Sequence, residues 1–152
     1  MKTVDALIKA KSLIARNAGE DYAGGGRTYD AMFRNKDGEA VKKRSEATCF
    51  CAIGAVIAAV DLDSESRIRG LLDCNPTTSM RKVAFRAFLY LNAASFVLFG
   101  ESAMYINDFP AGLGETDEVT HAKVMATYDL AIKNAKHRHI GRGVRRLKSV
   151  TK

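Results

Sequence analysis

Residues 46–60 read EATCFCAIGAVIAAV, and this stretch decides the fold. Arranged as a helix, it would carry Phe50 and Gly54 on one face and Ile53 on the opposite face, so that it would be apolar all round. A helix that is apolar on every side and too short to cross a bilayer is buried within a folded protein. We therefore expect residues 46–60 to form the central, most buried helix of a helical domain, with Ser45 as its cap.

Further helical patterns lie on both sides of this stretch. A first helix is expected from about Val4 to Ala18, where apolar residues recur on one face and Gly19 follows as a stop. After the central helix, the pattern predicts a short helix at 65–74, a long helix at 79–99 and a last helix from Thr120 to about Lys136. The sequence therefore predicts a mainly α fold, a compact single-domain bundle of about five helices.

A small β-hairpin is expected at the edge of this bundle, near residues 31–41. The turn sequence Asn35-Lys36-Asp37-Gly38 separates two short apolar pieces, residues 31–33 and 40–41. An Asp-Gly pair between such pieces is typical of a hairpin turn, because glycine accepts the positive φ that these turns need.

The charge of the chain is unevenly distributed. Of the 24 Lys and Arg residues, eight lie between Lys133 and Lys152, where there is no acidic residue. Residues 1–132 hold the other 16 basic residues and all 17 acidic ones, a net charge of −1, so the excess charge of +7 belongs to the C-terminal end. We therefore divide the chain into a helical domain, residues 1–136, and a basic tail, residues 137–152, expected to be flexible without a partner.

The cations around this tail are the strongest functional signal in the sequence. A dense positive segment binds the phosphates of DNA or RNA through counterion release, without reading the sequence. An acidic protein surface is the alternative partner. The predicted binding residues are Lys136, Arg138, Arg142, Arg145, Arg146, Lys148 and Lys152, with Lys42, Lys43 and Arg44 as an extension on the domain.

A cysteine nucleophile is the alternative chemistry. Cys51 would lie near the start of the central helix, where the helix dipole lowers a thiol pKa. His121 could act as the base and Asp108 as the orienting group, if the fold brings them together. A cysteine among Phe50 and Ile53 is more often a small core residue, and Asn107-Asp108-Phe109-Pro110 more often fixes a turn, so we favour a structural role for these residues.

No metal and no cofactor is predicted. Cys49 and Cys51 are two residues apart, so on a helix they would point about 200° away from each other and could not hold one ion. Gly24-Gly25-Gly26-Arg27 lacks the strand and the Lys-Ser/Thr pair of a phosphate-binding loop, and we interpret it as a flexible loop.

Three features of the sequence indicate the compartment in which the protein is expected. The first residues contain an acid, Asp5, where the apolar part of a signal peptide would begin, and the longest apolar run, residues 49–60, is too short for a membrane span. Three cysteines without framework spacing fit a reducing compartment. We therefore expect a cytoplasmic protein with no membrane partner.

Three segments together resemble a known family. They are Cys51 followed by Gly54-Ala55, the Asn107-Asp108 pair, and Thr120-His121 followed by Val124 and Asp129-Leu130-Ala131-Ile132. In this order they are similar to a family of small uncharacterised proteins found largely in bacteriophages and some bacteria. The resemblance covers about residues 4–135, excludes the tail, and departs at Ile106, where the family usually has Trp. It implies a phage origin, a bacterial host cell and one compact domain, and it supplies no catalytic residue.

The leading hypothesis is therefore a non-enzymatic phage accessory protein that binds a protein partner and contacts nucleic acid through its tail. A small cysteine hydrolase or transferase using Cys51 and His121 is the second hypothesis. An inhibitor of a host factor, in which the tail matches an acidic surface, is the third.

Overall fold

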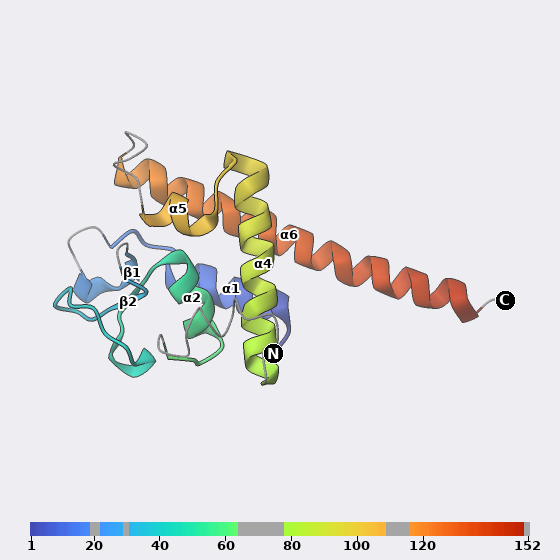
Figure 1. The fold of residues 1–152 in the computed structure, drawn as a ribbon, viewed down its shortest axis with the longest axis horizontal. Coiled ribbons are helices and arrows are strands. Elements are labelled where there is room, and N and C mark those ends of the chain that lie inside the picture. The colour runs from blue at the N-terminus through green and yellow to red at the C-terminus, as the bar shows by residue number, and fades with distance from the viewer. Residues whose placement is uncertain (19–21, 29–30, 64–77, 109–115, 151–152) are drawn as a thin grey trace.

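The computed structural model describes residues 1–18, 22–28, 31–63, 78–108 and 116–150, and the side chains of these residues as far as His137. Within them are five α-helices: α1 (Thr3–Leu13), α2 (Ala52–Ala59), α4 (Ser79–Phe99), α5 (Ala103–Asp108) and α6 (Asp117–Val150). A small three-stranded sheet is formed by β1 (Gly26–Arg27), β2 (Phe33–Arg34) and β3 (Cys49–Phe50). The predicted mainly α fold is confirmed (Figure 1). The helix expected at 65–74 lies outside the described residues.

The long helix α4 begins and ends as the sequence predicts. The side chain of Thr78 caps it by accepting a hydrogen bond from the backbone N–H of Arg81. Gly100 ends it in the left-handed conformation, at φ 74°. The first helix is shorter than predicted: α1 ends at Leu13, and Asn17 pairs with Arg27 beside the sheet.

The central helix α2 is entirely buried, as expected, but it is shorter than the predicted helix over residues 46–60. Cys49 and Phe50 form strand β3, which pairs in parallel with β1 and antiparallel with β2. The helix therefore begins at Ala52 with Cys51 as its N-cap, and Ser45 lies instead in a short 3-10 helix, Arg44–Glu46. An apolar run does not distinguish a buried strand from a buried helix. Here Cys49 and Phe50, at the start of the run, pair as a strand.

The predicted hairpin is present and packs against α2. The backbone N–H of Val41 donates to the carbonyl of Phe33, and the Asn35 side chain accepts hydrogen bonds from the backbone of Asp37 and Glu39. Gly54 on α2 faces this hairpin. A Cβ at Gly54 would lie 2.1 Å from the Met32 carbonyl oxygen, so the close approach requires glycine.

The last helix departs from prediction at both ends. It begins at Asp117 rather than Thr120, and a short helix, α5, lies between α4 and α6. At its other end α6 continues past Lys136 to Val150, so part of the tail, predicted to lack structure of its own, is helical. Helix α6 crosses α4 and then projects beyond the rest of the molecule (Figure 1). Among the side chains described on this helix, which end at His137, the last buried one is Ala135.

Among the described helices, α4 is long and apolar enough to cross a membrane by length and composition. It packs against the body through one face. Its inner face, with Ala84, Ala87 and Leu91 fully buried, contacts α1, α2, α5 and α6.

Candidate functional site

Cys51 caps the central helix and is almost fully buried. Its Sγ accepts a hydrogen bond from the backbone N–H of Gly54 at 3.2 Å, and its own backbone N–H donates to the Met32 carbonyl at 3.0 Å. Burial, and next the negative charge of Asp108, raise the pKa of the Cys51 thiol to about 12. The expectation that the helix start would lower this pKa is wrong, because desolvation of the thiolate outweighs the backbone N–H groups. At neutral pH the group is a thiol.

Asn107 joins three elements that are distant in sequence. Its Oδ1 accepts a hydrogen bond from the backbone N–H of Ala52 at 3.2 Å, and its Nδ2 donates to the Thr28 carbonyl at 3.1 Å and to Asp108 at 2.6 Å. The residue is 1% exposed. Asn107 and Asp108 end helix α5, and Asn107 holds α5 against α2 and the chain after β1. The other two residues of the predicted turn, Phe109 and Pro110, lie outside the described residues.

Tyr128 on α6 completes the support of the α2 N-terminus. Its hydroxyl donates a hydrogen bond to the Ala52 carbonyl at 2.6 Å, and the side chain is fully buried. Burial raises the pKa of Tyr128 well above its ordinary value, so the hydroxyl stays protonated and remains a donor. A pocket beside these groups is lined by Ala52, Leu91 and Val124 and is too small to admit a water molecule, so it offers no room for a substrate.

Arg27 is a buried charge that the sequence does not predict. Arg27 is 1% exposed, and its guanidinium contacts the Asp117 carboxylate at 2.5 Å and the Asn107 carbonyl at 3.5 Å. Asp117 also accepts a hydrogen bond from Asn17. This ion pair links β1 to the start of α6. No local sequence signal marks it, because only the fold brings residues 27 and 117 together.

The glycines before Arg27 allow the chain to approach α1 closely. Gly26 has φ 131°, and a Cβ there would lie 2.3 Å from the Arg16 carbonyl oxygen. Residues 22–24 form a 3-10 helix and Gly26 belongs to β1, so the described part of this segment is an ordered connection rather than the predicted flexible loop.

His121 is directed to the end of α1. Its Nε2 lies 3.1 Å from the Ala15 carbonyl, the geometry of an N–H donor. Burial lowers the His121 pKa, which favours the neutral ring. Asp108 is a neighbour of Cys51, but its charge opposes formation of a thiolate. The charge of Asp108 therefore acts on Cys51, whereas His121 bonds to the Ala15 carbonyl instead.

Two free cysteines, Cys49 and Cys51, are buried in the described part of the chain, and no group of three or more potential ligand side chains lies together there. Cys49 is part of β3 and its Sγ donates to the Tyr22 carbonyl at 3.3 Å. Cys49 and Cys51 therefore do not lie on the one helix that the sequence predicts: Cys49 lies in strand β3 and Cys51 caps α2.

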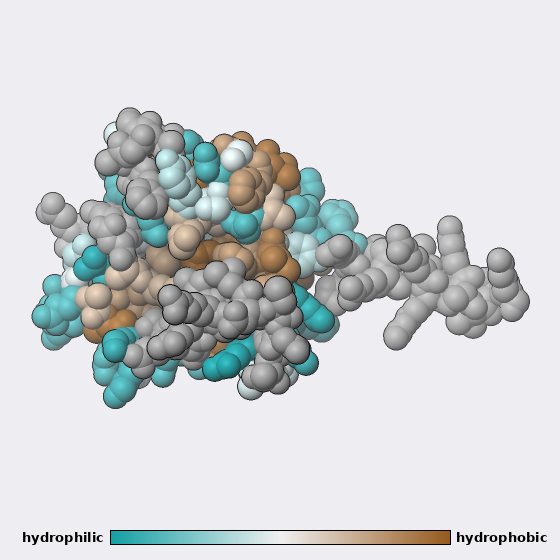
Figure 2. Space-filling model, viewed as in Figure 1, coloured by the Kyte–Doolittle hydropathy of each residue, from teal (hydrophilic) through white to brown (hydrophobic). Residues whose placement is uncertain are grey.

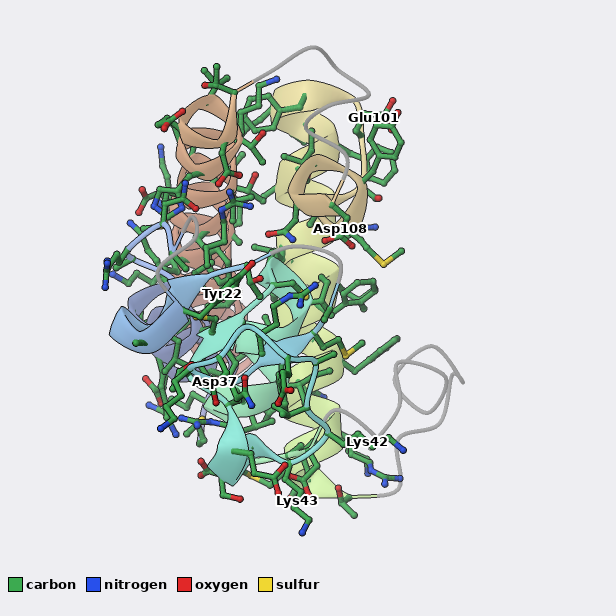
Figure 3. The ribbon with its side chains drawn as sticks, turned by 90° about the vertical axis from the view of Figure 1, so that its left-hand side faces the viewer. Tyr22, Asp37, Lys42, Lys43, Glu101 and Asp108 are labelled. Carbon is green, nitrogen blue, oxygen red and sulfur yellow. The ribbon has the colours of Figure 1, made fainter. Side chains whose placement is uncertain are left out.

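The cations of the body and those of the tail lie on different surfaces. Lys42 and Lys43 lie at the lower edge of the body in Figure 3, whereas the end of α6 projects from the opposite side of the body from the sheet in Figure 1. Lys43 approaches Glu46 at 3.8 Å, and the Arg44 guanidinium lies over the Phe50 ring. Lys136, by contrast, is exposed at the point where α6 leaves the body. The predicted extension of the binding surface across the domain is therefore not continuous with the tail.

Comparison with known proteins gives no relative from which a role could be transferred. No family model, no curated protein and no solved structure matches this chain. The function is therefore inferred from the residues and contacts described above.

Proposed function

We propose that the chain is a non-enzymatic accessory protein with two binding activities. The projecting end of α6 and the residues after it, the basic tail, bind DNA or RNA through the phosphate backbone. The helical body, residues 1–136, binds a protein partner. We place both activities in the cytoplasm of a bacterial host cell, in keeping with the family resemblance and with two buried cysteines, Cys49 and Cys51, that form no disulfide.

The observation that carries the nucleic-acid proposal is the length of α6. This helix has 34 residues, and its end projects beyond the body (Figure 1). That part holds Arg138, Arg142, Arg145, Arg146 and Lys148, with Lys152 just beyond, and no acid. A helix spaces such cations along its axis at about 1.5 Å per residue and is narrow enough for the major groove of DNA.

Binding through phosphates rather than bases follows from the composition of this segment. No Phe, Trp or Tyr follows Tyr128, so the tail lacks the large rings that stack on bases most strongly. Lys and Arg neutralise phosphates and release counterions, which gives affinity without sequence preference.

The contacts of Cys51 support the non-enzymatic part of the proposal. Its sulfur is used as a helix cap, its pKa is raised to about 12, and His121 is bonded to Ala15 instead. A nucleophilic cysteine requires the opposite, an accessible thiolate beside a base.

Charge neutralisation tests the nucleic-acid proposal. We expect Arg142→Gln, Arg145→Gln and Arg146→Gln together to weaken binding to a labelled mixed-sequence duplex, measured by fluorescence anisotropy, by at least about tenfold. The matched control neutralises Lys42 and Lys43, and should leave affinity within about twofold of the wild type.

Two outcomes would overturn the nucleic-acid proposal. Equal loss of affinity in both variants would place the contact on the body. Absence of DNA and RNA binding at low salt would leave an acidic protein surface as the partner of the tail.

A further inference from the structure

The outer face of α4 is a continuous exposed stripe. Leu89 and Phe96 are 49% and 51% exposed, although residues of this size are usually buried. The exposed positions follow one another at intervals of four and three residues: Lys82, Arg86, Leu89, Ala93, Phe96 and Gly100. This spacing keeps them on one side of the helix and is the spacing of a helix–helix packing seam. Figure 2 shows hydrophobic surface over the C-terminal end of α4.

The chemistry of this stripe changes along the helix. Two cations, Lys82 and Arg86, lie at its N-terminal end. Leu89 and the small Ala93 lie in the middle, and Phe96 lies near the C-terminal end. Glu101 follows, exposed and on the side of α4 away from α6 (Figure 3). One end of the stripe is therefore positive and the other end is apolar and then negative.

We propose that a second copy of this chain packs on the stripe, with its own α4 antiparallel to the first. With the pairing centred between Leu89 and Ala93, Leu89 of each copy lies opposite Ala93 of the other. Arg86 of each copy then lies opposite the Phe96 ring, and Lys82 lies beside Glu101. In this pairing a bulky side chain packs on a small one, a guanidinium lies against an aromatic ring, and an ammonium group lies beside a carboxylate.

Twofold symmetry strengthens this arrangement, because each of these contacts occurs twice in a self-complementary interface. The antiparallel direction also sets the positive end of each helix dipole beside the negative end of the other. A parallel pair would instead place Lys82 against Lys82 and Arg86 against Arg86. The stripe is thus complementary to itself in one direction only.

The dimer inference rests on the proposed protein-binding role of the body and names the partner as the chain itself. Sedimentation equilibrium of the full chain over a range of concentrations tests it. We expect the wild type to form dimers. Ala93→Glu, which places a carboxylate against Leu89 of the other copy at two symmetric sites, should raise the dimer dissociation constant by at least about a hundredfold. The matched control is Ala126→Glu, at an exposed alanine of α6, which should leave the constant unchanged within about twofold.

A charge exchange tests the antiparallel direction. Glu101→Lys should weaken the dimer severalfold, and adding Lys82→Glu to it should restore the dimer, because the opposite charges again face each other. A wild type that stays monomeric, an Ala93→Glu variant that dimerises normally, or a charge exchange without recovery would overturn the inference. Anisotropy with duplex DNA on the same samples separates the two claims: a monomeric wild type that binds DNA refutes the dimer and leaves the nucleic-acid proposal standing.

Discussion

The Oδ1 of Asn107 accepts a hydrogen bond from the backbone N–H of Ala52, the first residue of the buried helix α2, at 3.2 Å. A residue from the connection between α4 and α6 thereby satisfies an N–H group that has no partner within its own helix. Its Nδ2 binds the Thr28 carbonyl at the same time, so one side chain holds three segments in place.

Replacing Asn107 by Ala should lower the free energy of unfolding by about 2–4 kcal/mol, because two buried backbone groups lose their partners. Urea unfolding followed by circular dichroism measures this change. Asn134→Ala, at an exposed position of α6, is the control and should remain within about 0.5 kcal/mol of the wild type. Equal stability of the two variants would mean that Asn107 does not hold these elements together.

The buried thiol of Cys51 makes a prediction for alkaline pH. Its pKa in the folded protein is about 12, above the ordinary value of 9.0, so folding favours the protonated form. This stabilisation is fully present below pH 9 and is lost as pH rises from 9 towards 12, at up to about 1.4 kcal/mol per pH unit. Cys51→Ser keeps a capping oxygen and removes the thiol. Its free energy of unfolding, measured by urea unfolding at each pH, should decline less steeply over this pH range than that of the wild type.

Chemical labelling checks the same thiol directly. In the native protein Cys51 should react with iodoacetamide at neutral pH only at the rate of unfolding, because the buried group is not a thiolate. Rapid, selective alkylation of Cys51, located by peptide mass spectrometry, would refute the structural role and restore the enzyme hypothesis.

The ion pair between Arg27 and Asp117 should behave as a buried charge pair. Asp117→Asn leaves the fully buried guanidinium without its carboxylate and should destabilise the protein by about 3 kcal/mol. Adding Arg27→Met removes the isolated charge and should recover part of this loss. A double variant less stable than Asp117→Asn would show that Arg27 stabilises the fold mainly through its other contacts.

The positions of Gly54 and Gly100 each favour glycine for a different reason, and alanine substitution distinguishes the two reasons. Gly54→Ala places a methyl group against the Met32 carbonyl and should destabilise by about 1–3 kcal/mol, although alanine favours a helix. Gly100→Ala meets no neighbour within 4 Å and should lose only about 1 kcal/mol, through the left-handed backbone at φ 74°. Thermal denaturation of the two variants gives the comparison, and a Gly54→Ala protein as stable as wild type would contradict the observed packing.

The sequence predicts α4 correctly because its signals are local. Thr78 lies at the cap, the apolar residues follow the helical period, and Gly100 supplies the left-handed stop. The boundaries of α2 are not local: Cys49 and Phe50 belong to a strand because β1 and β2 pair with them. The end of α6 differs from the prediction because two glycines and the lack of apolar periodicity after Lys136 predict a stop that the helix does not make.

The candidate site likewise has features with a local sequence signal and features that depend on distant residues. The exposed cations could be counted from the sequence, and so could the apolar setting of Cys51. The burial of Arg27 and the three-way role of Asn107 could not be predicted, because each depends on partners 55 to 90 residues away. A buried arginine is also rare enough that no sequence pattern favours it.

The salt dependence of DNA binding tests the central claim most directly. The dissociation constant of the full chain for a mixed-sequence duplex should rise steeply with salt, with a log–log slope of magnitude about 0.9 for each phosphate contacted, or about 4–5 when five of the six tail cations take part. A chain ending at Lys136 should remain folded, because Ala135 is its last described buried residue, and should lose this binding. Affinity that does not change with salt, or that survives removal of residues 137–152, would contradict the account.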